Sequence, residues 1–185
     1  MNEWRGLSAR PALESPWLRV TQHSFMAPDG RHIPEYYIVE RPDSAICVCR
    51  VGDDVLLIRQ YRPGIAKDTL CHPGGRLEPG DDSPLSGVMR ELLEETGLSP
   101  HTVTALGVFA QIPAVETGRV HIFLADCEHD GDAVSSPELG EGLTTELVAI
   151  AELDKLITSG GMDCVACVAA SYKLLLTSAA AGAED

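Results

Sequence analysis

Runs of apolar residues recur along the chain, and their lengths predict a mixed α/β fold. Residues 45–51 and 55–61 are nearly continuous apolar runs of strand length, separated by a Gly-Asp-Asp turn. Runs of this kind are typical of central strands that are covered on both faces. The later segments 151–160 and 163–176 have helical periodicity. Shorter stretches with strand character lie at 17–26, 33–40, 103–111, 119–126 and 145–150.

One helix is expected in the middle of the chain, within GGRLEPGDDSPLSGVMRELLEETGL at 74–98. Ser83 is a favourable N-cap, Pro84 suits the first helical position, and Gly97 is a common helix end. A helical projection separates an apolar side from an acidic side. The apolar side comprises Leu85, Val88, Leu92 and Leu93, and the acidic side comprises Glu91, Glu94 and Glu95.

The ends of the chain carry weaker signals. Residues 1–16 show little periodicity, and we expect an irregular arm there. An Asp29-Gly30 pair between two extended segments predicts a hairpin turn. The alanine-rich tail at 178–185 is expected to fray. Strands flanking a central helix indicate an α/β sandwich with a mixed sheet.

The overall charge narrows the possible partners. The 185 residues carry a formal net charge of −14, which argues against binding to nucleic acid or to a membrane surface. A small phosphorylated ligand remains possible, because a bound divalent cation reverses the local field. The sequence has neither an apolar leader nor an apolar run of membrane-spanning length, so we expect a cytoplasmic protein.

The cysteines are interpreted first as free thiols. Cys47, Cys49 and Cys127 lie in apolar runs that are typical of a core. Cys164 and Cys167 have the CxxC spacing of some zinc ligands, but they lie in an alanine-rich helical pattern rather than in a loop. The sequence therefore favours buried thiols over a zinc site or a disulfide framework.

Three carboxylates within about 100° of one helix face repel one another, so a partner for them is expected. Clustered carboxylate oxygens suit hard divalent cations such as Mg²⁺ or Mn²⁺, which in turn hold phosphates. Solvated surface glutamates are the alternative, but they leave the preceding Gly74-Gly75 loop and the adjacent Arg90 unexplained.

The same stretch resembles the Nudix box, G-x5-E-x7-R-E-U-x-E-E-x-G-U, where U is a bulky aliphatic residue. Residues 90–98 match its second half at every specified position. The first half departs, because five residues separate Gly75 from Asp81 and eight separate Asp81 from Arg90. We favour Asp82 as the counterpart of the first glutamate, with one extra residue in the loop.

The resemblance implies an α/β/α Nudix fold and hydrolysis of a nucleoside diphosphate linked to another group. It also implies that Glu91 and Glu95 are the main metal ligands, with Glu94 as an additional one. A backbone carbonyl near Gly75 would complete the coordination, and Arg90 would orient the carboxylates.

Residues 17–176 are similar to the ADP-ribose or ADP-sugar pyrophosphatase branch of that family. The likeness rests on the Arg59-Gln60-Tyr61-Arg62 run and on Pro113, sixteen residues after Gly97. It implies a homodimer with an N-terminal arm and dimerisation strands at 1–42, a Nudix domain at 43–177 and a tail at 178–185. The implied substrate-binding residues are Trp17, Tyr36, Arg59, Arg62 and Pro113.

Each of these residues also has a simpler interpretation. Arg59 and Arg62 suit surface charges as well as anion contacts, and Trp17 and Tyr36 suit a core as well as a base-stacking position.

Two features leave the activity open. Cys71 stands where the branch usually has a glutamate that helps to bind metal. The general base of the branch is a loop glutamate before the last strand, and here Glu141 is the first candidate and Glu146 the second, with Glu138 nearby. The alternatives are therefore hydrolysis of GDP-mannose, NADH or a dinucleotide, or a nucleotide-sugar-binding regulator with weak turnover.

Overall fold

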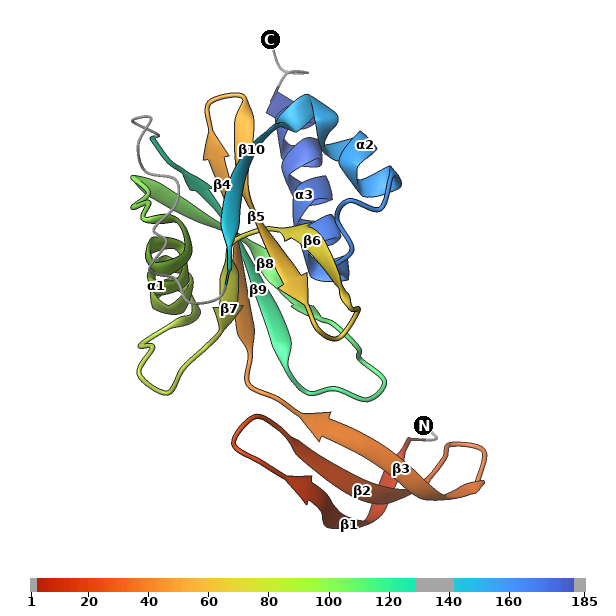
Figure 1. Cartoon of the computed structure of the whole chain (residues 1–185). Helices are drawn as coiled ribbons and strands as arrows, with labels where there is room; N and C mark the ends of the chain where they lie inside the picture. Colours follow the sequence, from red (N-terminus) through yellow and green to blue (C-terminus); the bar gives the residue numbers. More distant parts are fainter. Residues whose placement is uncertain (1–2, 129–141, 182–185) are drawn as a thin grey trace. The chain divides into compact units, whose positions relative to one another are not determined.

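The computed structural model describes residues 3–128 and 142–181, and it divides into two compact units. The first unit comprises Met1–Asp43 together with Ala110–Arg119. The second comprises Ser44–Phe109 together with Val120–Asp185. Figure 1 shows the strands and helices of each unit.

The first unit contains a three-stranded antiparallel sheet in the order β1-β2-β3. The predicted turn joins β2 to β3, and Gly30 adopts a positive φ of 83° there. A side chain at this φ is strained, which explains the glycine. The strands are β1 (Arg5–Glu14), β2 (Arg19–Met26) and β3 (His32–Glu40).

Strand β1 corrects the expectation of an irregular arm at 1–16. All ten of its residues are exposed, so no alternation of apolar and polar positions marks it in the sequence. Pro11 lies at a register shift in the pairing with β2, where an edge strand tolerates the missing N–H group. The strand is thus specified by its pairing with β2 and not by burial.

The second unit is built on a mixed sheet in the order β10-β5-β4-β9-β8. Strands β4 and β9 run parallel, whereas β4 pairs antiparallel with β5 and β5 with β10. Two short strands extend this sheet, since β6 pairs with β5 and β7 with β4. The bounds are β4 (Ser44–Val51), β5 (Asp54–Arg62), β6 (Lys67–Cys71), β7 (Gly74–Arg76), β8 (Thr102–Ala110), β9 (Arg119–Asp126) and β10 (Thr144–Ala149).

Helices cover both faces of this sheet, as Figure 1 shows. The helices are α1 (Pro84–Thr96), α2 (Leu153–Thr158) and α3 (Val165–Ala181), with a 3-10 turn at Ile150–Glu152. One core cluster packs the sheet against α1, and a second packs it against α2 and α3. The arrangement confirms the predicted α/β/α class, and β4 and β5 are buried as expected for central strands.

Helix α1 begins and ends where the sequence predicts. The Ser83 side chain accepts a hydrogen bond from the Ser86 N–H, and Gly97 closes the helix in the left-handed conformation. The predicted apolar side is only half correct, because Val88 and Leu92 are buried whereas Leu85 and Leu93 are 43% and 55% exposed. No helix among the described residues is long and apolar enough to cross a membrane.

Candidate active site

Two adjacent glycines bring backbone close to α1. Gly74 has a φ of +139°, and a Cβ atom there would overlap the carbonyl oxygen of Ala45 on β4. Gly75 pairs with Ala45 in the β4–β7 ladder. A Cβ atom at Gly75 would lie 2.5 Å from a carboxylate oxygen of Glu91. Gly74 therefore allows close packing against β4, and Gly75 leaves space that the Glu91 carboxylate occupies.

Two of the predicted metal ligands are directed at this glycine pair. A carboxylate oxygen of Glu95 accepts a hydrogen bond of 2.7 Å from the Gly74 N–H. Glu91 lies against Gly75, and its side chain is 17% exposed. The structure thus brings Gly75, Glu91 and Glu95 together, although they come from β7 and from two positions on α1.

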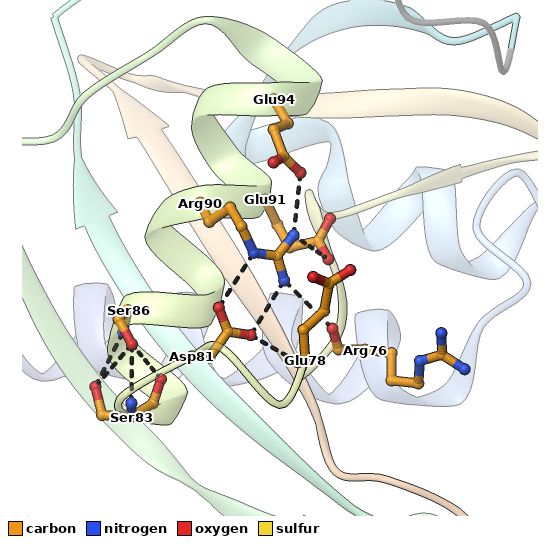
Figure 2. A network of polar contacts seen from close by, with 8 residues as sticks. All are labelled: Arg76, Glu78, Asp81, Ser83, Ser86, Arg90, Glu91 and Glu94. Carbon is orange, nitrogen blue, oxygen red and sulfur yellow. Dashed lines mark hydrogen bonds and ion pairs between the residues drawn. The ribbon is translucent and has the colours of Figure 1, made fainter. Parts of the chain in front are cut away.

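Arg90 is the centre of a polar network that joins α1 to the preceding loop (Figure 2). Its guanidinium group donates two hydrogen bonds of 3.1 Å to Asp81, one to each oxygen. It also donates to Glu91 at 3.2 Å and to Glu94 at 3.0 Å. A single cation therefore compensates three neighbouring carboxylates, and the planar fork fixes the geometry with Asp81.

The electrostatics follow from these contacts. The hydrogen bonds from Arg90 hold the pKa of Asp81 below its usual value, and the Glu78 N–H contributes in the same direction. Burial raises the pKa of Glu91, although the charge of Arg90 partly opposes that effect. The pKa of Arg90 is raised, chiefly by Asp81. Arg90 and Asp81 therefore both remain charged at neutral pH.

The loop before α1 differs in detail from the sequence interpretation. Asp81 is the aspartate of this loop that pairs with Arg90. Asp82 as the counterpart of the first box glutamate stays a prediction. The Asp81 side chain is 8% exposed, because the loop folds back onto Gly87 and Arg90. Glu78 was not predicted as a site residue, but Figure 2 shows it beside Arg90, and its charge raises the pKa of Glu91. The signal in the sequence was that Glu78 is a carboxylate in the loop between Gly75 and Arg90.

The donor set suits a hard divalent cation. Three carboxylates and a glycine backbone offer only oxygen ligands, which Mg²⁺ and Mn²⁺ prefer. The space beside Gly75, which any side chain would fill, also fits such a site. Among the described side chains no three converge on one point, because Arg90 engages Glu91 and Glu94 while Gly74 engages Glu95. A cation would therefore compete with these hydrogen bonds.

Arg59 and Glu146 form an ion pair between neighbouring strands β5 and β10. The guanidinium group meets both carboxylate oxygens, with Nη2 3.1 Å from Oε2. Arg59 lowers the pKa of Glu146, which makes that carboxylate a weaker base. Two residues that were predicted for different roles are therefore bound to each other.

The other predicted substrate residues fall in different places. Arg62 closes β5 in the second unit. In the first unit Trp17 is 66% exposed beside a cleft of about 400 Å³. The Tyr36 hydroxyl donates to the carbonyl of Ala114, so it lies beside the turn that contains Pro113. Neither aromatic residue belongs to the core.

Two further predictions bear on the chemistry. Glu138 and Glu141 lie outside the described residues. Cys71 is 3% exposed and contacts other thiols, so it adds no oxygen ligand where the branch usually has a glutamate.

Comparisons with known proteins agree with this fold. The NUDIX domain family matches residues 40–161, and the chain therefore belongs to that family. It is 33% identical over 91 residues to an ADP-ribose pyrophosphatase of Bacillus subtilis, covering 48% of each chain. It is 28% identical over 104 residues to the ADP-sugar pyrophosphatase of Mus musculus, covering 55% of this chain and 47% of that one. The predicted resemblance to this branch is confirmed.

The likeness in structure extends further along the chain. A crystal structure of an ADP compounds hydrolase superposes with a TM-score of 0.82 at 22% identity, covering 97% of this chain and 96% of the other. This agreement shows a common fold. In sequence, the chain spans about half the length of the curated relatives it matches.

Proposed function

We propose that the chain hydrolyses the pyrophosphate bond of a nucleoside diphosphate derivative. ADP-ribose or another ADP-sugar is the proposed substrate, with AMP and a sugar phosphate as products. The observation that carries this proposal is the placement of Glu91 and Glu95 against the glycine pair, with Arg90 fixing the same helix to Asp81. The names of the two relatives support the choice of substrate.

The proposed cofactor is Mg²⁺ or Mn²⁺. Glu91 and Glu95 would hold it, with Glu94 and the carbonyl near Gly75 as further ligands. When bound, such a cation polarises a phosphoryl oxygen and lowers the pKa of a coordinated water. Arg90 would stay bound to Asp81 and keep α1 in register with the loop, since that contact involves neither Glu91 nor Glu95.

Arg59 and Arg62 are the proposed contacts to the phosphates. The chain carries an excess of negative charge, so few of its side chains are cationic and able to bind an anionic ligand. Trp17, Tyr36 and Pro113 are the proposed contacts to the nucleoside. The exposed ring of Trp17 supports a stacking role, since an apolar ring of this size gains free energy when a base covers it.

The general base is proposed to be Glu141 or Glu146. The ion pair between Arg59 and Glu146 favours a different role for Glu146. As a positioning residue, Glu146 would hold the Arg59 guanidinium group in a fixed orientation. We expect Glu146→Gln to raise KM by roughly three- to tenfold with little change in kcat. Steady-state kinetics would check this, with Arg59→Lys as the matched variant and the double variant expected to be non-additive. A fall in kcat of about 100-fold or more would instead assign the base to Glu146.

The activity test is a substrate panel with Mg²⁺ or Mn²⁺, read by chromatography of the products. The panel contains ADP-ribose, ADP-glucose, GDP-mannose, NADH and a diadenosine polyphosphate. Fastest release of AMP from ADP-ribose would support the proposal. Faster turnover of another compound would replace the substrate, and no turnover of any would favour a nucleotide-sugar-binding regulator.

Glu95→Gln distinguishes an enzyme from a regulator. The amide oxygen can still accept from the Gly74 N–H, so the fold should be kept while a charged ligand is lost. We expect kcat to fall by about 100-fold or more, equivalent to ~2.7 kcal/mol in the activation free energy. Glu152→Gln is the matched control, because Glu152 is exposed and forms an ion pair with Lys155, away from the glycine pair. Ligand binding by Glu95→Gln without metal, measured by calorimetry, would support a regulator.

A further inference from the structure

Three cysteines, from the end of β6 and the start of α3, line one cavity. Cys71 ends β6, and Cys164 and Cys167 lie at the beginning of the helix. The three thiols shift one another's pKa values, so they lie close together. Two hydrogen bonds from backbone N–H groups hold the segments together. Leu70 N–H donates to the Gly161 carbonyl at 3.1 Å, and Asp163 N–H donates to the Thr69 hydroxyl at 3.0 Å.

Cys164 is the N-cap residue of a 17-residue helix. Its carbonyl accepts the first helical hydrogen bond from the Val168 N–H at 2.9 Å. The sulfur of an N-cap cysteine lies at the positive end of the helix dipole, which stabilises a thiolate.

The two cysteines of the CxxC segment are therefore chemically different. Hydrogen bonds from Cys167 and Cys71 lower the pKa of Cys164 far below its usual value. Donation to Cys164 and to Cys71, together with burial, raises the pKa of Cys167 well above it. Cys164 is also partly exposed, whereas Cys167 is 2% exposed. Cys164 is therefore the more accessible and the more acidic of the two thiols, and Cys167 lies one helical turn further along α3.

A cavity of about 360 Å³ gives access to this cluster. The residues that line it include Cys71, His72, Cys164 and Cys167, together with Arg62 from the end of β5. His72 is 1% exposed, its Nε2 lies 2.8 Å from the Ser171 hydroxyl, and its Nδ1 has no partner among the described residues. A buried ring nitrogen without a partner at a cavity of this size indicates a place for a small polar molecule.

We propose that Cys164 and Cys167 form a dithiol site that reacts with hydroperoxides. The Cys164 thiolate attacks the terminal oxygen of the hydroperoxide, the O–O bond breaks, and an alcohol or water leaves after taking up a proton. Cys164 is then a sulfenic acid, and Cys167 attacks its sulfur. The S–S bond forms and the sulfenic oxygen leaves as water, so two thiols are oxidised by two electrons and one peroxide is reduced.

A metal site is the competing use of three thiols. Soft thiolates bind zinc in a tetrahedral set. Over the parts of the chain that the structure describes, no group of three metal-ligating side chains is placed to hold an ion. The difference between Cys164 and Cys167 in exposure and protonation favours stepwise oxidation instead.

Tryptic mapping of the reduced full-length chain after one equivalent of hydrogen peroxide tests the proposal. Peptide 156–173 contains Cys164 and Cys167 alone, peptide 68–76 contains Cys71 alone, and Cys47 lies in the peptide that ends at Arg50. We expect peptide 156–173 to lose two hydrogen atoms and both free thiols. Cys47 serves as an internal control, because it is 1% exposed and burial raises its pKa to about 12. Cys164 should react at least about tenfold faster than Cys47.

Two variants make the outcome decisive without requiring the hydrolase activity. In Cys167→Ser the N-cap residue is unchanged, and we expect a Cys164 sulfenic acid that a 1,3-dione traps. In Cys164→Ser the Cys167 thiol should persist, with circular dichroism confirming the fold. Equal oxidation of Cys164 and Cys47 would overturn the proposal. So would zinc bound at one equivalent, or a disulfide that joins peptides 68–76 and 156–173.

Discussion

The sheets of the two units are stabilised in different ways. In the second unit, strands β4 and β5 are buried on both faces, with residues such as Leu56 and Leu57 fully inaccessible. The first unit has almost no core of its own, and its most buried residues include Ala27 at 6% and Gln22 at 9%. Burial specifies the second unit, whereas the backbone ladder and cross-strand pairs specify the first.

This difference indicates where each unit depends on something outside itself. Large apolar side chains lie exposed in the first unit, including Trp4 at 56%, Leu13 at 53% and Trp17 at 66%. Exposed apolar surface on a small sheet is typical of an interaction site. The homodimer expected from the family resemblance remains our proposal for the partner. The second unit should then carry stability and chemistry, and the first should carry assembly.

The largest effect is expected from truncation of the core beneath α1. Leu92 is fully buried and Leu93, its neighbour, is 55% exposed. We expect Leu92→Ala to lower the free energy of unfolding by roughly 2–5 kcal/mol because a cavity remains, and Leu93→Ala to change it by less than ~0.5 kcal/mol. Urea denaturation of the two variants measures the difference. Equal losses would mean that α1 does not bury the face seen here.

A smaller effect, confined to the site, is expected for Asp81→Asn. The change removes the charge that fixes Arg90, so kcat/KM should fall by about tenfold, whereas Asp82→Asn should be nearly neutral. Assembly should not change, and light scattering would check it. A greater loss of kcat/KM with Asp82→Asn than with Asp81→Asn would support Asp82 as the counterpart of the first box glutamate.

The same pair has a pH signature of defined sign. Because Arg90 lowers the pKa of Asp81 in the folded state, the carboxylate stabilises the fold above its unfolded pKa of about 3.9. That contribution is lost as the pH falls through the lowered folded pKa. The stability gap between wild type and Asp81→Asn should therefore be complete at neutral pH and should close in acid.

The smallest effect on stability is expected in the first unit. Leu13→Ser replaces an exposed residue of β1, and Leu176→Ser replaces one of α3 that is 71% exposed. Each should change the free energy of unfolding by less than ~0.5 kcal/mol at concentrations where the chain is monomeric. Only Leu13→Ser should weaken the proposed dimer, as measured by light scattering across a dilution series. An equal effect of both variants, or of neither, would contradict the division of roles.

Local rules predicted much of the second unit because its signals are local. Ser83, Pro84 and Gly97 set the ends of α1 through contacts within a few residues, and continuous apolar runs marked β4 and β5. Strand β1 was missed because an exposed edge strand needs no alternation of apolar and polar residues. The evidence for β1 is its pairing with β2, and the sequence of β1 alone does not contain that information.

The site was predictable in its residues and less so in its pairings. The spacing of Glu91 and Glu95 placed both on one helix face, and the Gly74-Gly75 loop argued against ordinary surface glutamates. The choice between Asp81 and Asp82 depends on how the loop folds back, and a residue count does not contain that information. The ion pair of Arg59 with Glu146 requires the register of β5 against β10, and the thiol cluster requires β6 to meet α3.

The adjacent glycines at 74 and 75 would be held in place by two different selective pressures. At position 74 any side chain meets backbone of β4, and the positive φ adds strain, so substitutions there would be removed through loss of folding. At position 75 the obstacle is the Glu91 carboxylate, a side chain that can turn away. In a related protein that had lost the activity, position 75 could therefore accept other residues while position 74 stayed glycine. Gly74 would then reflect a requirement of the fold, and Gly75 a requirement of the activity.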